Sequence, residues 1–445
     1  METSESGSGP ALAAVPSQAD ASSARSAEGA PETDRVRRRL TALDTFRGCL
    51  VVLRIFIGSQ VEELAAPVLL HADGFGLTVA DLVAPGFLFI MGLAVPVSMS
   101  AFLRAPGAGD PGRPDRRRQL LRIGRRAVLL YAIGTFLNAY PFLPEELAHL
   151  RFTGVLQRLA VVYLVVSLLY VSCAWSLLPG ARTRVTRLLV RGFLLGGFPL
   201  VGVAGWIVAT YTFHSPWPEC ADVHGLVRDC SLEAYLDTGM WGTGHNFNGA
   251  RFDPEGLLST VVAAVNCWAG LVIGIDIVRH RQRYGTVGGV RRRASLLIAV
   301  GVVCVAAGLA LGLVIPIGKQ LWTPSYALVT VGIMTVGFGA VLLVFDGGLR
   351  PVTVGASPVG STLVALGRNP LFFYVLSEVV IDTLDYLPLR HHGEQGSVWS
   401  VLPEVGLASW LPGPLASAAW AALWLLLFYV PIARLLVARG WYIRV

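Results

Sequence analysis

The segment SLLIAVGVVCVAAGLALGLVIPI, residues 295–317, contains no charged side chain. An α-helix rises 1.5 Å per residue, so about 20 apolar residues cross the roughly 30 Å of hydrocarbon in a bilayer. Similar apolar runs alternate with short polar loops along the chain. These runs are continuous rather than alternating in polarity, which indicates membrane-spanning helices and not the strands of a closed barrel.

We therefore predict an all-α, polytopic membrane helix bundle of about ten transmembrane helices. The composition agrees, because the 445 residues are 54% hydrophobic and 15% charged, with a mean hydropathy of +0.60. A soluble protein of this length would carry about 25% charged residues. The predicted spans cover residues 44–62, 78–101, 124–140, 153–174, 189–211, 256–278, 295–317, 326–345, 359–383 and 413–437.

The loop charges predict how the bundle is oriented. Arg-rich loops follow the second, fourth and sixth spans, and such loops concentrate on the cytoplasmic side of membrane proteins. Ten spans then place both termini in the cytoplasm. Residues 1–38 are predicted to be a disordered cytoplasmic tail, and residues 39–445 one membrane domain with a long outer loop at 212–255. The formal net charge of +7 belongs to loops beside the lipid bilayer, so no nucleic-acid partner is expected.

Two of the six cysteines lie in the long outer loop. Cys220 and Cys230 are ten residues apart there, where an oxidising exterior permits a disulfide. We predict that they are bonded to each other. Neither has histidines at the spacing of a zinc site, so no metal is expected.

Ionisable residues within apolar spans are costly and often functional, and one set of them lies on the cytoplasmic side. Asp44 and Arg47 are three residues apart in LDTFRG. They form either a structural ion pair or an anion site, because the planar Arg fork binds phosphate well. Arg368 and Asn369 precede Pro370 inside the ninth span. A helix broken at that depth indicates a ligand cavity.

A second polar set lies on the outer side. His71 precedes the second span, and Asp81 lies at the mouth of that span. A histidine that a carboxylate orients is a standard general base; a purely structural histidine is the alternative. Glu255 follows Pro254, which also suits an ordinary helix start. The remaining candidates for binding a polar ligand are Gln157, Arg158, His245, Asn246 and Lys319, the last being the sole lysine.

These residues predict a membrane enzyme or carrier that engages an anion from the cytoplasm and a polar group outside. A multi-pass transporter of a small anionic or sugar-like solute is the main alternative, because it also needs many spans and buried charges. The absence of a visible internal repeat disfavours it. A non-enzymatic scaffold is disfavoured by the ionisable residues at membrane depth.

The same residues lie in strings that resemble the heparan-α-glucosaminide N-acetyltransferase family of multi-pass membrane acyltransferases. The strings run in family order over most of the chain after residue 38. They are RLTALDTFRG (39–48), GLTVADLVAPGFLFIMG (76–92), GVLQRL (154–159), FDPEGLLST (252–260), IPIGKQLW (315–322) and GRNPLFFY (367–374).

The resemblance implies transfer of an acetyl group from cytoplasmic acetyl-CoA to a sugar amine across the membrane, and it makes a homodimer reasonable. His71 stands five residues before GLTVADL, where the family has its catalytic His, and Asp81 matches the Asp of the second helix. Asp44, Arg47 and Asn369 match the D-T-F-R-G and G-x-N strings. With Arg368, these three are expected to hold the acyl-CoA. Gln157, Lys319 or Asn369 would stabilise the oxyanion.

Two departures from the family pattern concern the acceptor. Arg54-Ile-Phe-Ile-Gly58 replaces a stretch that usually carries an Asn, and Gly318 replaces the Asn of the P-I-N-K string. The family acceptor is therefore not assumed for this chain. The Arg-rich, Lys-poor composition fits a GC-rich bacterial genome and a bacterial cytoplasmic membrane. The acceptor expected there is an amine or hydroxyl of an envelope glycan or of a glycosylated metabolite.

Overall fold

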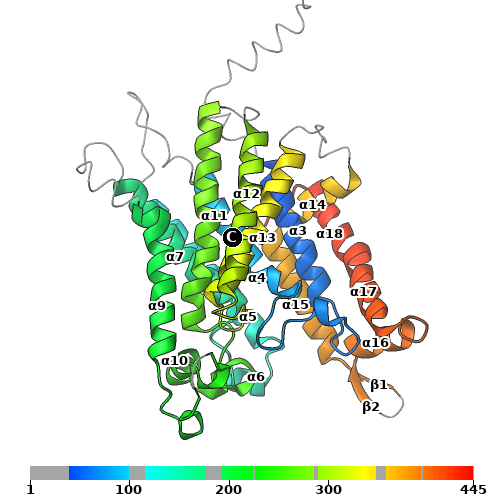
Figure 1. The fold of residues 1–445 in the computed structure, drawn as a ribbon. Helices are drawn as coiled ribbons and strands as arrows, with labels where there is room; N and C mark the ends of the chain where they lie inside the picture. The colour runs from blue at the N-terminus through cyan, green and yellow to red at the C-terminus, as the bar shows by residue number, and fades with distance from the viewer. Residues whose placement is uncertain are drawn as a thin grey trace, which may run out of the picture.

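The computed structural model describes residues 40–99, 116–176, 192–223, 226–284, 289–346, 357–391 and 394–443, and it is mostly helical. The predicted tail 1–38 lies outside these residues. Long helices stand side by side in a bundle (Figure 1). They are α3 (Thr41–Gly58), α4 (Val83–Ser98), α5 (Arg116–Ala139), α7 (Val155–Ser176), α9 (Phe198–Thr212), α11 (Leu257–Tyr284), α12 (Val290–Leu311), α13 (Pro324–Phe345), α14 (Pro358–Arg368), α15 (Pro370–Tyr386), α17 (Gly413–Leu423) and α18 (Val430–Ala438).

Within the described residues, six helical segments are long and apolar enough to cross a membrane, and a bent pair makes a seventh. The multi-pass membrane character predicted from the sequence is thereby confirmed. Helices α3, α5 and α9 occupy three further predicted spans. The π-helical turns η4 (Phe193–Gly197) and η9 (Trp424–Tyr429) continue into α9 and α18 respectively.

The bent pair consists of α14 and α15, which meet at 84°. The break falls at Asn369, immediately before Pro370. Proline lacks an N–H and disfavours helical geometry in the residue before it. The predicted interruption of the ninth span is therefore present.

The structure differs from the prediction at the end of the span that contains helix α12. The prediction carried this span to residue 317, but the helix ends at Leu311. Gly312 and Pro316 follow, and the residue before a proline avoids helical geometry. Lys319 consequently lies in an irregular segment, 312–323, between α12 and α13 and not at the end of a helix.

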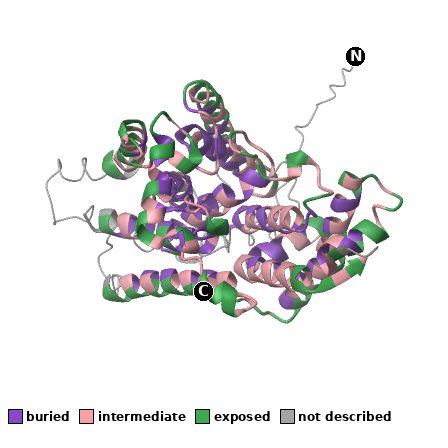
Figure 2. Ribbon diagram, turned by 90° about the horizontal axis from the view of Figure 1, so that it is seen from below, coloured by how far each residue is buried: buried purple, intermediate pink, exposed green. Residues whose placement is uncertain are grey.

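Close helix contacts depend on glycine. A Cβ on Gly92 of α4 would lie 1.8 Å from the carbonyl oxygen of Cys267, and one on Gly270 of α11 would lie 1.9 Å from that of Phe89. Small residues let membrane helices approach until their backbones touch. Buried residues follow the inward faces of the helices, and exposed ones the outward faces (Figure 2).

Shorter elements lie at one end of the bundle, drawn at the bottom of Figure 1. They include α6 (Pro144–Ala148), α10 (Leu232–Trp241), α16 (Val398–Gly406) and the antiparallel strands β1 (Pro388–His391) and β2 (Glu394–Ser397). Residues 212–223 and 226–255 form a cap here, which consists of α10 and the turns that flank it. The predicted Cys220–Cys230 disulfide is present in this cap, with Cα atoms 5.6 Å apart.

Candidate functional site

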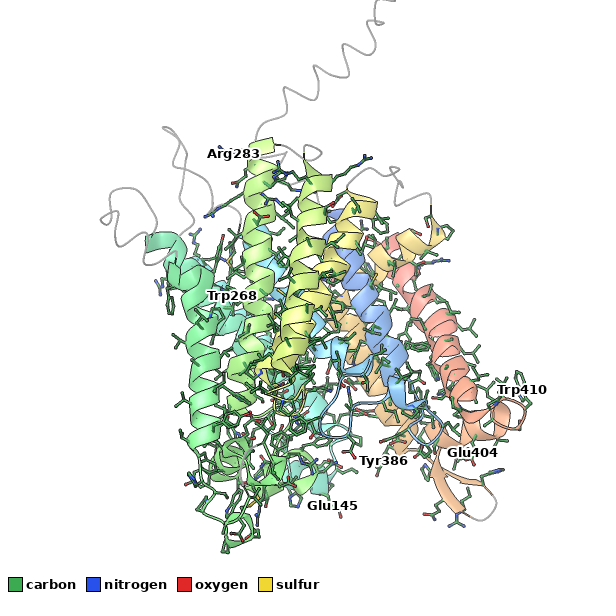
Figure 3. All side chains as sticks on the ribbon, in the orientation of Figure 1. Glu145, Trp268, Arg283, Tyr386, Glu404 and Trp410 are labelled. Atoms are coloured by element: carbon green, nitrogen blue, oxygen red, sulfur yellow. A yellow bond between two sulfur atoms is a disulfide. The ribbon has the colours of Figure 1, made fainter. Side chains whose placement is uncertain are left out.

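The predicted site residues separate into two sets at opposite ends of the bundle. Figure 3 shows Arg283 at one end and Glu145 and Tyr386 at the other. At the Arg283 end, Asp346 accepts a hydrogen bond from the backbone N–H of Ala42 (3.3 Å) and lies 3.8 Å from Arg281. These contacts place the start of α3, with Asp44 and Arg47, at that end.

His71 and Asp81 form the centre of the other set. His71 Nδ1 lies 2.9 Å from Asp81 Oδ1. The second carboxylate oxygen accepts hydrogen bonds from the backbone N–H and the hydroxyl of Thr78, each at 3.0 Å. Asp81 is fully buried, whereas the His71 side chain is 56% exposed. A neutral imidazole held this way donates Nδ1–H to Asp81 and keeps a lone pair on Nε2.

Lys319 completes this cluster. Its Nζ lies 3.0 Å from Nδ1 and 3.1 Å from Nε2 of His71, and 3.9 Å from Asp81 Oδ1. Because Cε1 lies between the two ring nitrogens, an amine nearly equidistant from both must lie out of the ring plane. The Nε2 lone pair therefore remains free for a reacting group.

Two loops that are distant in sequence hold the cluster together. The backbone N–H of Gly76 donates to the carbonyl of Ile317 at 2.7 Å. The Tyr326 hydroxyl donates to the Asp81 carbonyl at 2.6 Å. Beside them, Trp322 has a left-handed φ of 46° and is fully buried. Such a backbone is costly for a bulky residue and persists only where the surroundings fix it.

Arg158 lies under this Trp322 ring, 4.7 Å from its centroid. It is buried, and it donates to the Pro254 carbonyl and the Ser259 hydroxyl, both at 2.6 Å, and to Thr260 at 3.2 Å. The guanidinium therefore joins α7 to the start of α11. Gln157, the preceding residue, has a buried side-chain nitrogen that makes no hydrogen bond.

An acidic pair before α11 binds a second arginine. Arg151 donates to both carboxylate oxygens of Asp253, at 2.7 and 2.5 Å, and to Glu255 at 2.6 Å. Burial opposes ionisation of Glu255, yet the charges of Arg151, Arg158 and Lys319 keep its pKa below the usual value. Burial also lowers the pKa of Lys319, and Glu255 and Asp81 act in the opposite direction. Glu255, Arg158 and Lys319 are thus electrostatically connected.

Two predicted ligand-binding residues instead contact backbone carbonyls, one in the cap and one in the segment before α7. His245 Nδ1 lies 2.9 Å from the Leu150 carbonyl oxygen, and its ring lies 5.0 Å from that of Phe152. Asn246 donates to the Arg251 carbonyl at 3.1 Å, although its own side-chain oxygen is buried without a hydrogen bond. These contacts fasten the cap to the segment before α7.

The four residues predicted to bind the acyl-CoA donor lie together at the Arg283 end of the bundle. Arg47 lies 3.4 Å from Asp44 and also 3.4 Å from the carbonyl oxygen of Gly367, at the end of α14. A Cβ on Gly367 would lie 1.9 Å from the Asp44 carbonyl oxygen. Glycine at 367 is therefore needed for α14 to touch α3 beside Arg47.

Asn369 and Arg368 contact the last described residues. Asn369 accepts a hydrogen bond from the Ile443 backbone N–H (2.8 Å) and donates to the Trp441 carbonyl (3.2 Å). Arg368 donates to the Tyr442 hydroxyl at 3.1 Å. Asn369 lies with Arg47, at the other end from His71, so the suggestion that it stabilises an oxyanion at His71 is wrong.

The sequence did not single out Arg151 or Glu378 as important. Glu378 of α15 pairs with Arg54 of α3, whose guanidinium lies 5.0 Å from the centroid of Tyr374. An available signal was the scarcity of arginine in the loops that the sequence predicts to lie outside, which makes Arg151 unusual. For Glu378, the signal was the positive charge of Arg54 inside the first predicted span, because such a charge needs an acidic partner at a similar depth.

The comparisons agree with this arrangement of motifs. Residues 39–213 match the family described as "Heparan-alpha-glucosaminide N-acetyltransferase, catalytic". The proteins named heparan-alpha-glucosaminide N-acetyltransferase from Mus musculus and Homo sapiens are each 28% identical to this chain, over 451 and 379 residues. The chain is similar to that family over residues 39–213 and to these two proteins over most of its length. Three of the six strings that carry the resemblance, FDPEGLLST, IPIGKQLW and GRNPLFFY, lie beyond residue 213, and the first two supply Glu255 and Lys319.

The matches cover 93% and 77% of this chain but 62% and 53% of the mouse and human proteins. The chain thus spans between half and two thirds of the length of the curated relatives it matches. The description of the matched family is that of an acetyltransferase catalytic domain. The described part of this chain holds six helical segments long and apolar enough to cross a membrane, or seven with the bent pair.

Proposed function

We propose that this chain is an acyl-CoA-dependent transmembrane N- or O-acetyltransferase. It moves an acetyl group from cytoplasmic acyl-CoA to an amine or hydroxyl of a sugar or glycosylated acceptor at the outer face. The observation that carries the proposal is the cluster of His71, Asp81 and Lys319, at the bundle end opposite Arg47. Such a separation suits a donor and an acceptor that approach from different sides.

The proposed topology has ten crossings, with both ends of this chain in the cytoplasm. A helix or bent helix pair at each predicted span supports this number. The Arg-rich end marked by Arg283 is the cytoplasmic one (Figure 3), because such charges favour that side. We place the protein in a cell membrane, the bacterial cytoplasmic membrane being the one that the composition suits.

The donor binds with its phosphates near Arg47 and Arg368. Arg47 is oriented by Asp44, and a planar guanidinium forms paired hydrogen bonds with phosphate oxygens. Asn369 fixes the break between α14 and α15 by holding the 441–443 segment. The acyl arm then extends through the bundle toward His71.

Two routes lead from thioester to product. In the direct route, His71 Nε2 takes the proton from the acceptor amine or hydroxyl, the acceptor attacks the thioester carbonyl, and CoA leaves as a thiolate that is then protonated. In the covalent route, Nε2 attacks the thioester carbonyl first and expels CoA as a thiolate that is then protonated. The acceptor next attacks the acetyl-imidazole, loses its proton and leaves the imidazole free. Lys319 and the unpartnered amide of Gln157 stabilise the oxyanion in either route. Arg158 and Glu255 line the acceptor side, and the contacts of His245 and Asn246 hold the cap beside it.

Acetyl-CoA binding separates this proposal from the transporter alternative. Purified protein in detergent is titrated calorimetrically with acetyl-CoA, using wild type, Arg47→Ala and Arg434→Ala. Arg434 is a matched control, because it lies on α18 and donates hydrogen bonds to the Thr362 hydroxyl. We expect binding that Arg47→Ala weakens about tenfold and Arg434→Ala leaves unchanged. No binding by the wild type would overturn the proposal.

A further inference from the structure

An exposed aromatic side chain lies on the same loop as His71. Phe75 is 46% exposed and lies between Gly74 and Gly76, whose φ angles are 82° and 139°. Both angles fall in the left-handed region that favours glycine. The two glycines therefore set the local turn that presents the Phe75 ring, four residues after His71.

Phe75 rests against the loop that carries Lys319. A Cβ on Gly318 would lie 2.7 Å from Cδ1 and 3.1 Å from Cε1 of the Phe75 ring. One edge of the ring thus lies on the bare backbone of Gly318, and any larger residue there would displace it. The Gly76–Ile317 hydrogen bond fixes the two loops beside this contact. Phe75 consequently lies beside Gly318, the residue before Lys319, whose amine contacts His71.

We propose that Phe75 is the acceptor-binding platform of the transferase. The open part of its ring binds the apolar C–H face of a pyranose, whose amine or hydroxyl then lies beside His71 and Lys319. Binding sites of this kind combine an aromatic surface with a few polar groups that fix orientation, and an aromatic ring supplies a large, rigid contact area. This inference rests on the proposed function and adds to it the residue that selects a ring-shaped acceptor.

The exposure of Phe75 indicates that its ring binds a ligand and does not stabilise the core. A phenylalanine needed for the core would be covered, as Phe89 and Phe338 are in this structure. Phe75 instead lies against Gly318 at one edge and leaves nearly half of its surface exposed. A ring that only touches lipid would contribute nothing to the Michaelis constant of the acceptor, so kinetics separate the two roles.

The test measures acetyl transfer from acetyl-CoA to glucosamine and to phenyl glucosaminide. The variants are Phe75→Ala, Phe75→Trp and Phe136→Ala. Phe136 on α5 is a matched control, because it is also 46% exposed. We expect Phe75→Ala to raise the acceptor KM about tenfold with little change in kcat or in acetyl-CoA affinity. Phe75→Trp retains a low KM, and Phe136→Ala behaves like the wild type.

A second variant guards against misfolding. Gly318→Ala keeps Phe75 but pushes its ring aside, so it too should raise the acceptor KM. The inference is overturned if Phe75→Ala matches Phe136→Ala, or if its defect lies wholly in kcat or in acetyl-CoA binding. Failure of the wild type to acetylate either sugar would count against the proposed function itself, and the platform would fall with it.

Discussion

The amine of Lys319 lies 3.0 and 3.1 Å from the two ring nitrogens of His71, although the residues are 248 positions apart. The same imidazole contacts the buried carboxylate of Asp81. A base, its orienting carboxylate and a cation thus meet at one end of a membrane bundle. Such a combination suits a reaction in which negative charge develops next to a histidine.

Lys319 should matter for rate and for its pH dependence. Replacing Lys319 with Met removes the positive charge that stabilises the oxyanion and should lower kcat by about 10²–10³-fold. Burial lowers the pKa of Lys319 below the usual lysine value of 10.5, so the ammonium is lost earlier as pH rises. The wild-type rate should therefore fall on the alkaline side, below pH 10.5.

Arg stays protonated throughout this range, which makes Lys319→Arg the informative companion variant. Its steady-state rate, followed from neutral to alkaline pH, should lack the alkaline fall that the wild type shows. An identical fall in Lys319→Arg would mean that another group titrates, and the role given to Lys319 would be rejected.

Arg158 should be needed for stability as well as for activity. Replacing it with Ala leaves the Pro254 carbonyl and the Ser259 hydroxyl without a buried donor and opens a space beneath Trp322. We expect a loss of about 3 kcal/mol, measured as a lower melting temperature in detergent. Arg228→Ala is the control, because its pair with Asp229 is half exposed. Equal melting temperatures for the two variants would contradict the structural role.

The two ends of the site were not equally predictable from sequence. The long apolar runs locate nearly every helix, since burial in lipid dictates both their length and their composition. Pro370 likewise predicts the break in the ninth span. His71 and Asp81 are ten residues apart, so their contact is within the reach of local reasoning.

The contacts of Lys319 could not be predicted from the sequence. They depend on where α12 ends and on the backbone hydrogen bond from Gly76 to Ile317, which joins two loops that are distant in sequence. Asn369 was assigned to the donor, and its hydrogen bonds to residues 441 and 443 could be seen only in three dimensions. His245 appeared available for a ligand, yet it contacts a backbone carbonyl 95 positions away.

The cap should lose stability as pH rises through about 6. Burial raises the pKa of Asp237 to about 6 from an ordinary 3.8. The folded cap therefore binds this proton more tightly than the unfolded chain. The resulting stability is complete below about pH 4, is lost as pH approaches 6, and amounts to on the order of 3 kcal/mol.

Melting curves between pH 4 and 7 test this for the wild type and for Asp237→Asn, which cannot ionise. The variant should show a weaker dependence on pH. Some dependence should remain, because burial also raises the pKa of Glu233. A wild type that becomes more stable between pH 4 and 6 would contradict the assignment.

Helix contact at the donor end should control acetyl-CoA affinity. Gly367→Ala places a Cβ against the Asp44 carbonyl and should separate α14 from α3. Since Arg47 also lies near the Gly367 carbonyl, we expect weaker acetyl-CoA binding, by about tenfold, and an unchanged acceptor KM. Gly205→Ala on α9 is the control, because its added Cβ would meet no atom within 4 Å. Equal calorimetric affinities for the two variants would exclude the link between this contact and the donor.

The central claim is that His71 carries out acetyl transfer, and radiolabelled acetyl-CoA tests it most directly. Purified wild type and His71→Ala are incubated with the label and a panel of amino sugars and glycosides, and label is followed on both sugar and protein. We predict transfer to a sugar by the wild type alone; label on wild-type protein without acceptor would indicate the covalent route. Full transfer by His71→Ala would contradict the account.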